Sequence, residues 1–217
     1  MDTNVAPSTT TGILHDAAGY DLMLWLATLG NERSLRERIL RLAGLAAGET
    51  VLDVGCGTGT LAVTAKRQVG FSGAVFGIDA SQAMISRARA KARKARLAVS
   101  FDCGVAEALP FSEGRFDAVL STIMLHHLPR AARGEAVREM RRVLRPRGRI
   151  LAVDFEGAST HHLGPLVHLH RRHGHVTARE LRAIFEDAGL DVIEYGDAGI
   201  RNLHFVLATK RPDIILS

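Results

Sequence analysis

From Thr50 to Lys210 the chain alternates between short apolar runs and longer amphipathic stretches. The runs with the length and residue types of strands are "TVLDV", "AVFGI", "LAVSF", "FDAVLS", "RILAVDF", "DVIEY" and "LHFVLA". Between them lie stretches with helical spacing, such as the apolar stripe Ala136, Val137, Met140, Val143 and Leu144. This alternation predicts an α/β fold, in which a mostly parallel sheet carries helices on both faces. Ligands of such sheets bind at the carboxyl ends of the strands.

Capping and breaking residues mark where individual helices begin and end. Thr177 and Glu180 have the spacing of a capping box, and Gly189 closes the helix that follows. Pro146 and Gly148 are expected to end the preceding helix before "RILAVDF" begins, and a turn with a short helix is expected after "LAVSF". One connection, residues 156–176, is too long for a plain loop, so we expect it to form a lid or substrate segment.

Length and composition indicate one main domain. The chain has 217 residues, of which 47% are apolar and 24% charged, as in ordinary soluble proteins. Residues 1–45 are expected to form a tail and an N-terminal helical lid, and residues 46–210 the main domain. No run reaches the length of a membrane span, and the first residues lack the features of a signal peptide, so a cytoplasmic location is expected. The two cysteines have no metal-ligand or redox spacing.

The net charge of +5 raises the question of an anionic partner. No aromatic interleaving and no nucleic-acid motif accompany the basic residues, so nucleic acid is not an expected partner. The densest basic run, "RARAKARKAR" at 87–96, alternates with alanine on a helix, which is typical of a solvated face. Peripheral contact with an anionic membrane surface is the alternative interpretation of this run.

The stretch "VLDVGCGTGTLA", residues 51–62, is a strand that breaks into three glycines and resumes as a helix. A tight turn without a ligand is one interpretation. A dinucleotide fingerprint would need a third glycine at position 60, where this chain has Thr60, and no Gly-Lys-Ser/Thr follows as in a P-loop. The turn therefore differs from both common phosphate cradles.

Two acidic residues refine the interpretation of this turn. Asp53 stands just before the glycines, where its carboxylate would repel a pyrophosphate and attract a sulfonium or an ammonium group. Asp79 ends the next strand, and a carboxylate there can accept hydrogen bonds from both hydroxyls of a ribose. The pattern favours a cationic nucleoside.

With these features the sequence resembles the class I S-adenosylmethionine-dependent methyltransferases of the small-molecule type, and among them the ubiquinone and menaquinone C-methyltransferases. The resemblance rests on "VLDVGCGTG", "GIDAS", "AEALPF", "FDAVLSTIMLHHL" and "EMRRVLRPRGRILAVDF", which occur in the family's order. It implies a Rossmann-like, doubly wound, seven-stranded sheet whose last strand is antiparallel, and S-adenosyl-L-methionine as cofactor. It also implies methyl transfer to a small hydrophobic or lipid-like acceptor.

The resemblance also implies a set of cofactor-binding residues. Asp53, Gly55, Gly57 and Gly59 would surround the methionine portion, and Asp79 the ribose. The remaining positions are implied around the adenine and the rim of the site: Ala80, Met84, Val105, Ala106, Ser121 and, from the N-terminal lid, Tyr20. Relatives often carry an aspartate where this chain has Val105, which leaves backbone groups or Glu107 to bind the adenine amino group.

The end of the fourth strand informs the choice of acceptor. Methyltransferases of base or glutamine amines typically carry an Asn-Pro-Pro-Tyr type motif there, and this chain has "STIML". His126 and His127 follow, near where an acceptor would enter, and are the candidate catalytic residues. Packing beneath the lid is the alternative role for both.

Six of the ten histidines fall between positions 161 and 175. Their spacing matches no established zinc pattern, and no cysteine or carboxylate lies among them, so no metal site is expected and a polar lid is favoured. Two other functions remain as alternatives to a methyltransferase: a non-catalytic S-adenosylmethionine-binding scaffold and, more distantly, an NAD-dependent oxidoreductase.

Overall fold

The computed structural model describes residues 32–155, 176–199 and 203–212. Its strands form one seven-stranded sheet in the order β3-β2-β1-β4-β5-β7-β6. They are β1 (Thr50–Val54), β2 (Ala74–Asp79), β3 (Ser100–Cys103), β4 (Phe116–Thr122), β5 (Leu144–Phe155), β6 (Leu190–Asp197) and β7 (Leu203–Lys210). The helices are α2 (Glu32–Ala43), α3 (Thr60–Val69), α4 (Gln82–Ala95), the short 3-10 helix η1 (Leu125–His127), α5 (Arg130–Val143) and α6 (Ala178–Asp187).

The pairing of the strands confirms the expected doubly wound sheet. Strands β1 to β5 pair in parallel, and the last strand, β7, runs antiparallel to both β5 and β6. The chain order reverses beside β1, since β2 lies on one side of it and β4 on the other. A crevice for a ligand is expected at such a reversal, outside the carboxyl ends of the strands.

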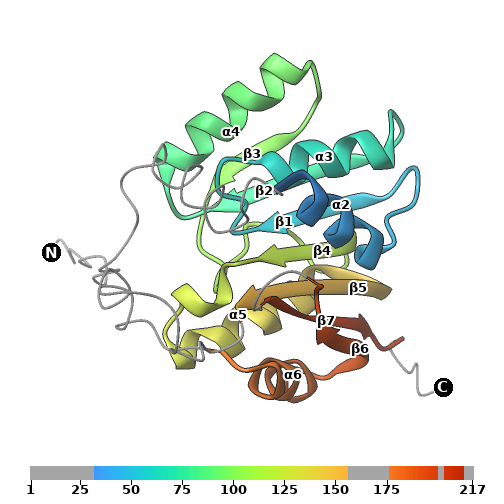
Figure 1. Cartoon of the computed structure of the whole chain (residues 1–217), viewed down its shortest axis with the longest axis vertical. Helices are drawn as coiled ribbons and strands as arrows, with labels where there is room; N and C mark the ends of the chain where they lie inside the picture. The colour runs from blue at the N-terminus through green and yellow to red at the C-terminus, as the bar shows by residue number, and fades with distance from the viewer. Residues whose placement is uncertain (1–31, 156–175, 200–202, 213–217) are drawn as a thin grey trace, which may run out of the picture.

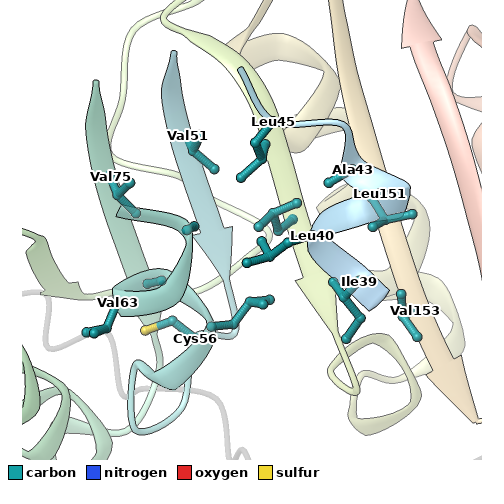
Figure 2. Packing of buried hydrophobic residues seen from close by; sticks show 14 of the residues in the cluster. Ile39, Leu40, Ala43, Leu45, Val51, Cys56, Val63, Val75, Leu151 and Val153 are labelled. Carbon is teal, nitrogen blue, oxygen red and sulfur yellow. The ribbon is translucent and has the colours of Figure 1, made fainter. Parts of the chain in front are cut away.

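Two apolar layers hold the helices against the sheet. Helices α2, α3 and α4 cover one face, and α5 and α6 cover the other (Figure 1). Figure 2 shows Ile39, Leu40 and Ala43 of α2 packed beside Leu151 and Val153 of β5. Both faces of the central strands are therefore buried, which explains their nearly continuous apolar sequences.

Most local signals in the sequence are confirmed. The side chain of Thr177 accepts a hydrogen bond from the backbone N–H of Glu180 at 3.1 Å, and Ser81 caps α4 in the same way through Met84. Gly189 follows α6 with a φ of 78°, in the left-handed region where glycine carries no steric penalty.

One expectation is wrong, and one strand begins earlier than expected. Residues 104–115 form turns, so the short helix expected after the third strand is absent there. Helix α5 ends at Val143, before Pro146 as expected, but β5 begins at Leu144 and not at Arg149. Leu144 pairs with Phe116 of β4, which extends the strand toward the helix.

Other expectations lie outside the described residues. These are the helix predicted from Tyr20, and the predicted lid except for its last residue, Val176, which is fully buried. Among the described helices, none is both long and apolar enough to cross a membrane.

Candidate active site

The predicted site residues converge at the carboxyl ends of β2, β1 and β4, which are neighbours in the sheet. Asp53 lies in β1, Asp79 ends β2, and Ser121 lies near the end of β4. The glycine turn, residues 55–59, connects β1 to α3 at the same edge. The alternation of strands and helices thus brings together residues that are far apart in the sequence.

The glycine turn is held against β2 by its own backbone. The N–H groups of Gly55 and Cys56 both donate to the carbonyl of Ile78, at 2.8 and 2.9 Å. Gly55, Gly57 and Gly59 have φ values of 73°, 52° and 75°, in the left-handed region that L side chains rarely adopt. Each predicted glycine therefore meets a conformational need of the turn.

Two of these glycines are also sites of close packing. A Cβ added to Gly59 would lie 2.7 Å from Cβ of Ala88 in α4 and equally close to the ring of Phe101. A Cβ on Gly55 would overlap the side chain of Met124, which follows β4. The turn is thus fixed between α4 and the segment that leads into η1.

Asp53 is a buried carboxylate without a matching cation. Its side chain is 2% exposed, and Oδ2 has no hydrogen-bond partner among the described residues. Burial, and secondarily the charge of Asp79, raises the pKa of Asp53 to about 7. An unpaired buried carboxylate is costly in an apo protein, and a cationic ligand would relieve that cost.

Asp79 has a different environment. Its Oδ2 accepts a hydrogen bond from the N–H of Gly57 and its Oδ1 one from the N–H of Ser81, both at 2.9 Å. Burial raises the pKa of Asp79, and these two hydrogen bonds oppose the rise. The carboxylate links the glycine turn to the start of α4, and each oxygen keeps a lone pair for a ribose hydroxyl.

The residues expected around the adenine differ in exposure. Met84, in the first turn of α4, and Ala106 are buried, whereas Ala80 is exposed and Val105 is 47% exposed. An exposed Val105 offers an apolar surface to a ligand and no hydrogen bond. On the other side of the site, Ser121 Oγ and Thr122 Oγ1 are buried without partners among the described residues.

The chain makes a strained turn where β4 ends. Ile123 has a φ of 54°, which is unusual for a β-branched residue, and its N–H donates to the carbonyl of Val153 at 2.7 Å. A strained backbone of this kind is retained only where many surrounding contacts hold it in place, and such positions cluster at functional sites. The turn directs the chain into η1, which carries His126 and His127. We call residues 123–128 the histidine turn.

Asp154 anchors the histidine turn. The ring Nδ1 of His126 lies 2.6 Å from Asp154 Oδ1, and the backbone N–H of His126 donates to Oδ2 at 3.0 Å. The N–H of Phe155 also donates to Oδ1, at 2.7 Å. The rings of His126 and His127 lie side by side, with centroids 3.9 Å apart. Asp154 is 1% exposed, so this anchor is a buried one.

Arg133 of α5 is a second anchor. Its Nε donates to the carbonyls of Leu125 and Leu128, at 3.1 Å each, and the residue is 2% exposed. Burial lowers the pKa of this guanidinium, which remains charged. Sequence reasoning missed both anchors. Asp154 could have been found as a third aspartate near the end of a parallel strand, whereas Arg133 looks like any solvated helix arginine.

The basic run of α4 is mostly exposed, as expected of a solvated face. Arg89 donates to the carbonyl of Phe101, and Lys91 turns inward, where its Nζ donates to Thr58 Oγ1 at 2.8 Å and to the hydroxyl of Thr60. Lys91 thus holds the glycine turn and the start of α3 through these hydrogen bonds. The charge pattern of the sequence did not indicate this role.

Two predicted features cannot be placed. Tyr20 and the histidine-rich segment 161–175 lie outside the described residues. Elsewhere, within the described ranges, no group of three or more histidine, cysteine or acidic side chains could hold a metal ion.

Comparison with known proteins gives a consistent picture. Residues 51–148 match the family model described as "Methyltransferase domain". The ubiquinone/menaquinone biosynthesis C-methyltransferase UbiE of Enterobacter sp. (strain 638) is 31% identical over 216 residues, which cover 87% of this chain and 85% of the relative.

Solved structures agree on the fold. A SAM-dependent methyltransferase from Aquifex aeolicus is similar with a TM-score of 0.74 and 24% identity, covering 89% of this chain and 98% of the other. The cyclase SpnF has a TM-score of 0.71 and 21% identity, with 82% and 81% covered. Since SpnF is a cyclase, the fold alone does not determine the reaction.

The residues at the site fit S-adenosylmethionine. The buried carboxylate of Asp53, whose Oδ2 lacks a partner among the described residues, suits the cationic methionine portion, and the glycine turn leaves room for close approach of a ligand to the backbone. Asp79 stands where a ribose can be bound. Taken with the 31% identity over most of both chains, these features show that the chain belongs to the S-adenosylmethionine-dependent methyltransferases related to UbiE.

Proposed function

We propose that this methyltransferase acts on a small hydrophobic or lipid-like acceptor. The relatives at about 30% identity are named as ubiquinone/menaquinone biosynthesis C-methyltransferases, which supports an acceptor of that kind. The sequence "STIML" at the end of β4 lacks the motif typical of enzymes that methylate base amines. The observation that carries the proposal is the contact between the acidic glycine cradle and the histidine turn, through Gly55 and Met124.

The cradle residues have separate roles in this proposal. Bound S-adenosylmethionine supplies an activated methyl group on a sulfonium. Asp53 and the glycine turn hold its methionine portion, and Asp79 holds its ribose. The adenine and the rim of the site are assigned to Ala80, Met84, Val105, Ala106, Ser121 and Tyr20. The protein's contribution to such a displacement is positioning and exclusion of water.

His126 and His127 face the acceptor in this proposal. His126 is the better placed of the two, because Asp154 holds both its ring and its backbone. Residues 156–176 follow β5 directly, so a lid formed by them would start beside the histidine turn.

The proposed division of the chain is a tail with lid helices at residues 1–45 and a main domain at residues 46–210.

Two partner assignments belong to the same proposal. The exposed side chains of Arg87, Arg93 and Lys94 on α4 can face an anionic membrane, which would suit a lipid acceptor. Binding of the protein to vesicles with anionic lipids, and not to neutral ones, would support this contact. Nucleic acid is not a proposed partner. If the immobilised protein retains DNA no better than it retains a neutral polymer, that result would agree with this assignment.

Calorimetry ranks the proposed function against its alternatives. We expect S-adenosylmethionine and S-adenosylhomocysteine to bind and NAD not to bind. Heat with NAD alone would favour an oxidoreductase, and absence of heat with both adenosyl compounds would end the methyltransferase proposal.

A panel of phenolic, quinol, amine and fatty acceptors, assayed by release of S-adenosylhomocysteine, then identifies the acceptor. Release with hydrophobic members only is the expected result. Cofactor binding without turnover on any member would favour a binding scaffold.

A further inference from the structure

The histidine turn is fixed from two elements that are remote in sequence. Asp154 near the end of β5 receives three hydrogen bonds, two of them from backbone N–H groups that can only donate. Each oxygen of Asp154 accepts a backbone N–H, Oδ2 from His126 and Oδ1 from Phe155, so the carboxyl group acts as an acceptor through both oxygens. In this geometry the ring is the donor, which assigns the proton between Asp154 and His126 to Nδ1 of the histidine.

This arrangement determines which ring nitrogen is available. When Nδ1 of a neutral imidazole carries the proton, Nε2 has a free lone pair. Nε2 lies on the far side of the ring from Asp154. An imidazole oriented in this way can accept a proton, and the imidazolium that forms would face a buried carboxylate.

Arg133 of α5 also holds the histidine turn in place. Its Nε bonds to the carbonyls of Leu125 and Leu128, which bracket the two histidines. The guanidinium is also close enough to Asp154 for their charges to interact. The salt bridge of Arg130 with Glu180, at 2.9 Å, joins α5 to α6 on the same side of the sheet.

The turn also touches the cradle. Met124, two residues before His126, packs against Gly55 so closely that no Cβ would fit between them. Ile123, the residue before Met124, has a positive φ of 54°, which is unfavourable for a β-branched residue. The position of His126 is thus coupled to the glycine turn through one side chain.

We propose that Asp154 and Arg133 are positioning residues, which fix the histidine turn so that His126 presents Nε2 as the proton acceptor for the methyl acceptor. The proton leaves the acceptor for Nε2, the electron pair of that bond stays on the acceptor, and the imidazole becomes an imidazolium. This inference rests on the proposed function and adds to it a specific protonation state and two residues outside the cradle.

Nitrogen-15 NMR of the imidazole rings tests the orientation without any substrate. The spectrum is recorded at a pH where the rings are neutral, and His126 is assigned as the signal lost in His126→Gln. We expect the Nδ1–H tautomer to dominate in the unmodified protein and the Nε2–H tautomer to gain in Asp154→Ala. A dominant Nε2–H form in the unmodified protein would overturn the proposal, even if the variant fails to fold.

Asp117→Asn is the matched control. Like Asp154, Asp117 accepts a backbone N–H, in this case from Thr50 of β1 at 2.8 Å. It lies at the amino end of β4, however, whereas the candidate site lies at the carboxyl ends of the strands. We expect this control to leave the tautomer of His126 unchanged. The same tautomer change in the control as in Asp154→Ala would count against a specific role for Asp154.

Kinetics with an acceptor from the panel completes the test. Asp154→Asn and Arg133→Met should lower kcat at least about tenfold, because a positioned general base typically contributes a hundredfold or more. Calorimetric affinity for S-adenosylmethionine should change less than about threefold, and Arg133→Lys should recover only part of kcat because one ammonium replaces a fork of donors. An unchanged kcat in both variants would refute the inference, whereas absent cofactor binding in the unmodified protein would refute the proposed function.

Discussion

The stability of the apo protein should depend on pH through Asp53. Its carboxylate is buried, lacks a hydrogen-bond partner at Oδ2 among the described residues, and has a pKa raised from its ordinary 3.8 to about 7. The folded protein therefore holds this proton more tightly than the unfolded chain does. The contribution to the free energy of unfolding is fully present below about pH 4 and is lost as the pH rises through about 7.

The size of the effect follows from the two pKa values. Proton linkage with 3.8 in the unfolded chain and about 7 in the folded protein gives a loss of about 2 to 3 kcal/mol between about pH 5 and about pH 8. The whole difference of about 3 pKa units corresponds to about 4 kcal/mol, approached only over a wider pH range. Asp79 contributes in the same direction, since burial raises its pKa as well.

Asp53→Asn isolates this contribution. Urea unfolding of the apo protein at about pH 5 and about pH 8 should show that the unmodified protein loses about 2 to 3 kcal/mol more than the variant between the two conditions. Any fixed cost of the substitution cancels in this double difference. Asp187→Asn, at an exposed position on α6, is the control and should behave as the unmodified protein does.

Saturating S-adenosylmethionine should reduce the difference, because a cation beside Asp53 favours its ionised form. Equal pH dependence of the unmodified apo protein and Asp53→Asn would show that Asp53 is ionised at neutral pH without the cofactor. The electrostatic account of the cradle would then be refuted.

Three further predictions concern the cradle and the frame that holds it. Asp79→Ala should weaken binding of S-adenosylmethionine by about 1.5 to 3 kcal/mol in calorimetry, since a buried charged hydrogen-bond partner is lost, and unchanged affinity would contradict its assignment to the ribose. Gly59→Ala should destabilise the protein by more than Gly44→Ala in urea unfolding. Both glycines have a positive φ, but an added Cβ would meet neighbours 2.7 Å away at Gly59 and nothing within 4 Å at Gly44, so equal losses would argue against close packing at Gly59. Thr177→Ala should cost about 1 kcal/mol through loss of the α6 cap, and no change in the urea midpoint would contradict the capping box.

Local patterns predicted the frame of the site well. Alternating apolar runs predicted the sheet, and the glycine spacing predicted three residues with positive φ, because both depend on short-range sterics and burial. The early start of β5 follows from a tertiary contact, because Leu144 pairs with Phe116 of β4.

The anchors of the histidine turn could not be predicted in the same way. Arg133 is buried because the carbonyls of Leu125 and Leu128 lie where its side chain ends, and this is a property of how α5 packs on the turn. The strain at Ile123 has no sequence signal either, since a β-branched residue at positive φ contradicts local preference. Sequence reasoning proposed the candidate residues of the site, and it missed Asp154 and Arg133, which hold the histidine turn.

Three aspartates at the carboxyl ends of parallel strands show why position alone does not define a role. Asp53 has an oxygen without a partner and is suited to a cation, whereas Asp79 bonds two backbone N–H groups and holds the glycine turn. Asp154 accepts two backbone N–H groups and lies 2.6 Å from the ring Nδ1 of His126, and the role proposed for it is to set the tautomer of that ring. The same side chain at equivalent places in β1, β2 and β5 performs three tasks because its neighbours differ. Exchanging Asp53 for asparagine should therefore alter the pH dependence of stability, whereas the same exchange at Asp154 should alter turnover.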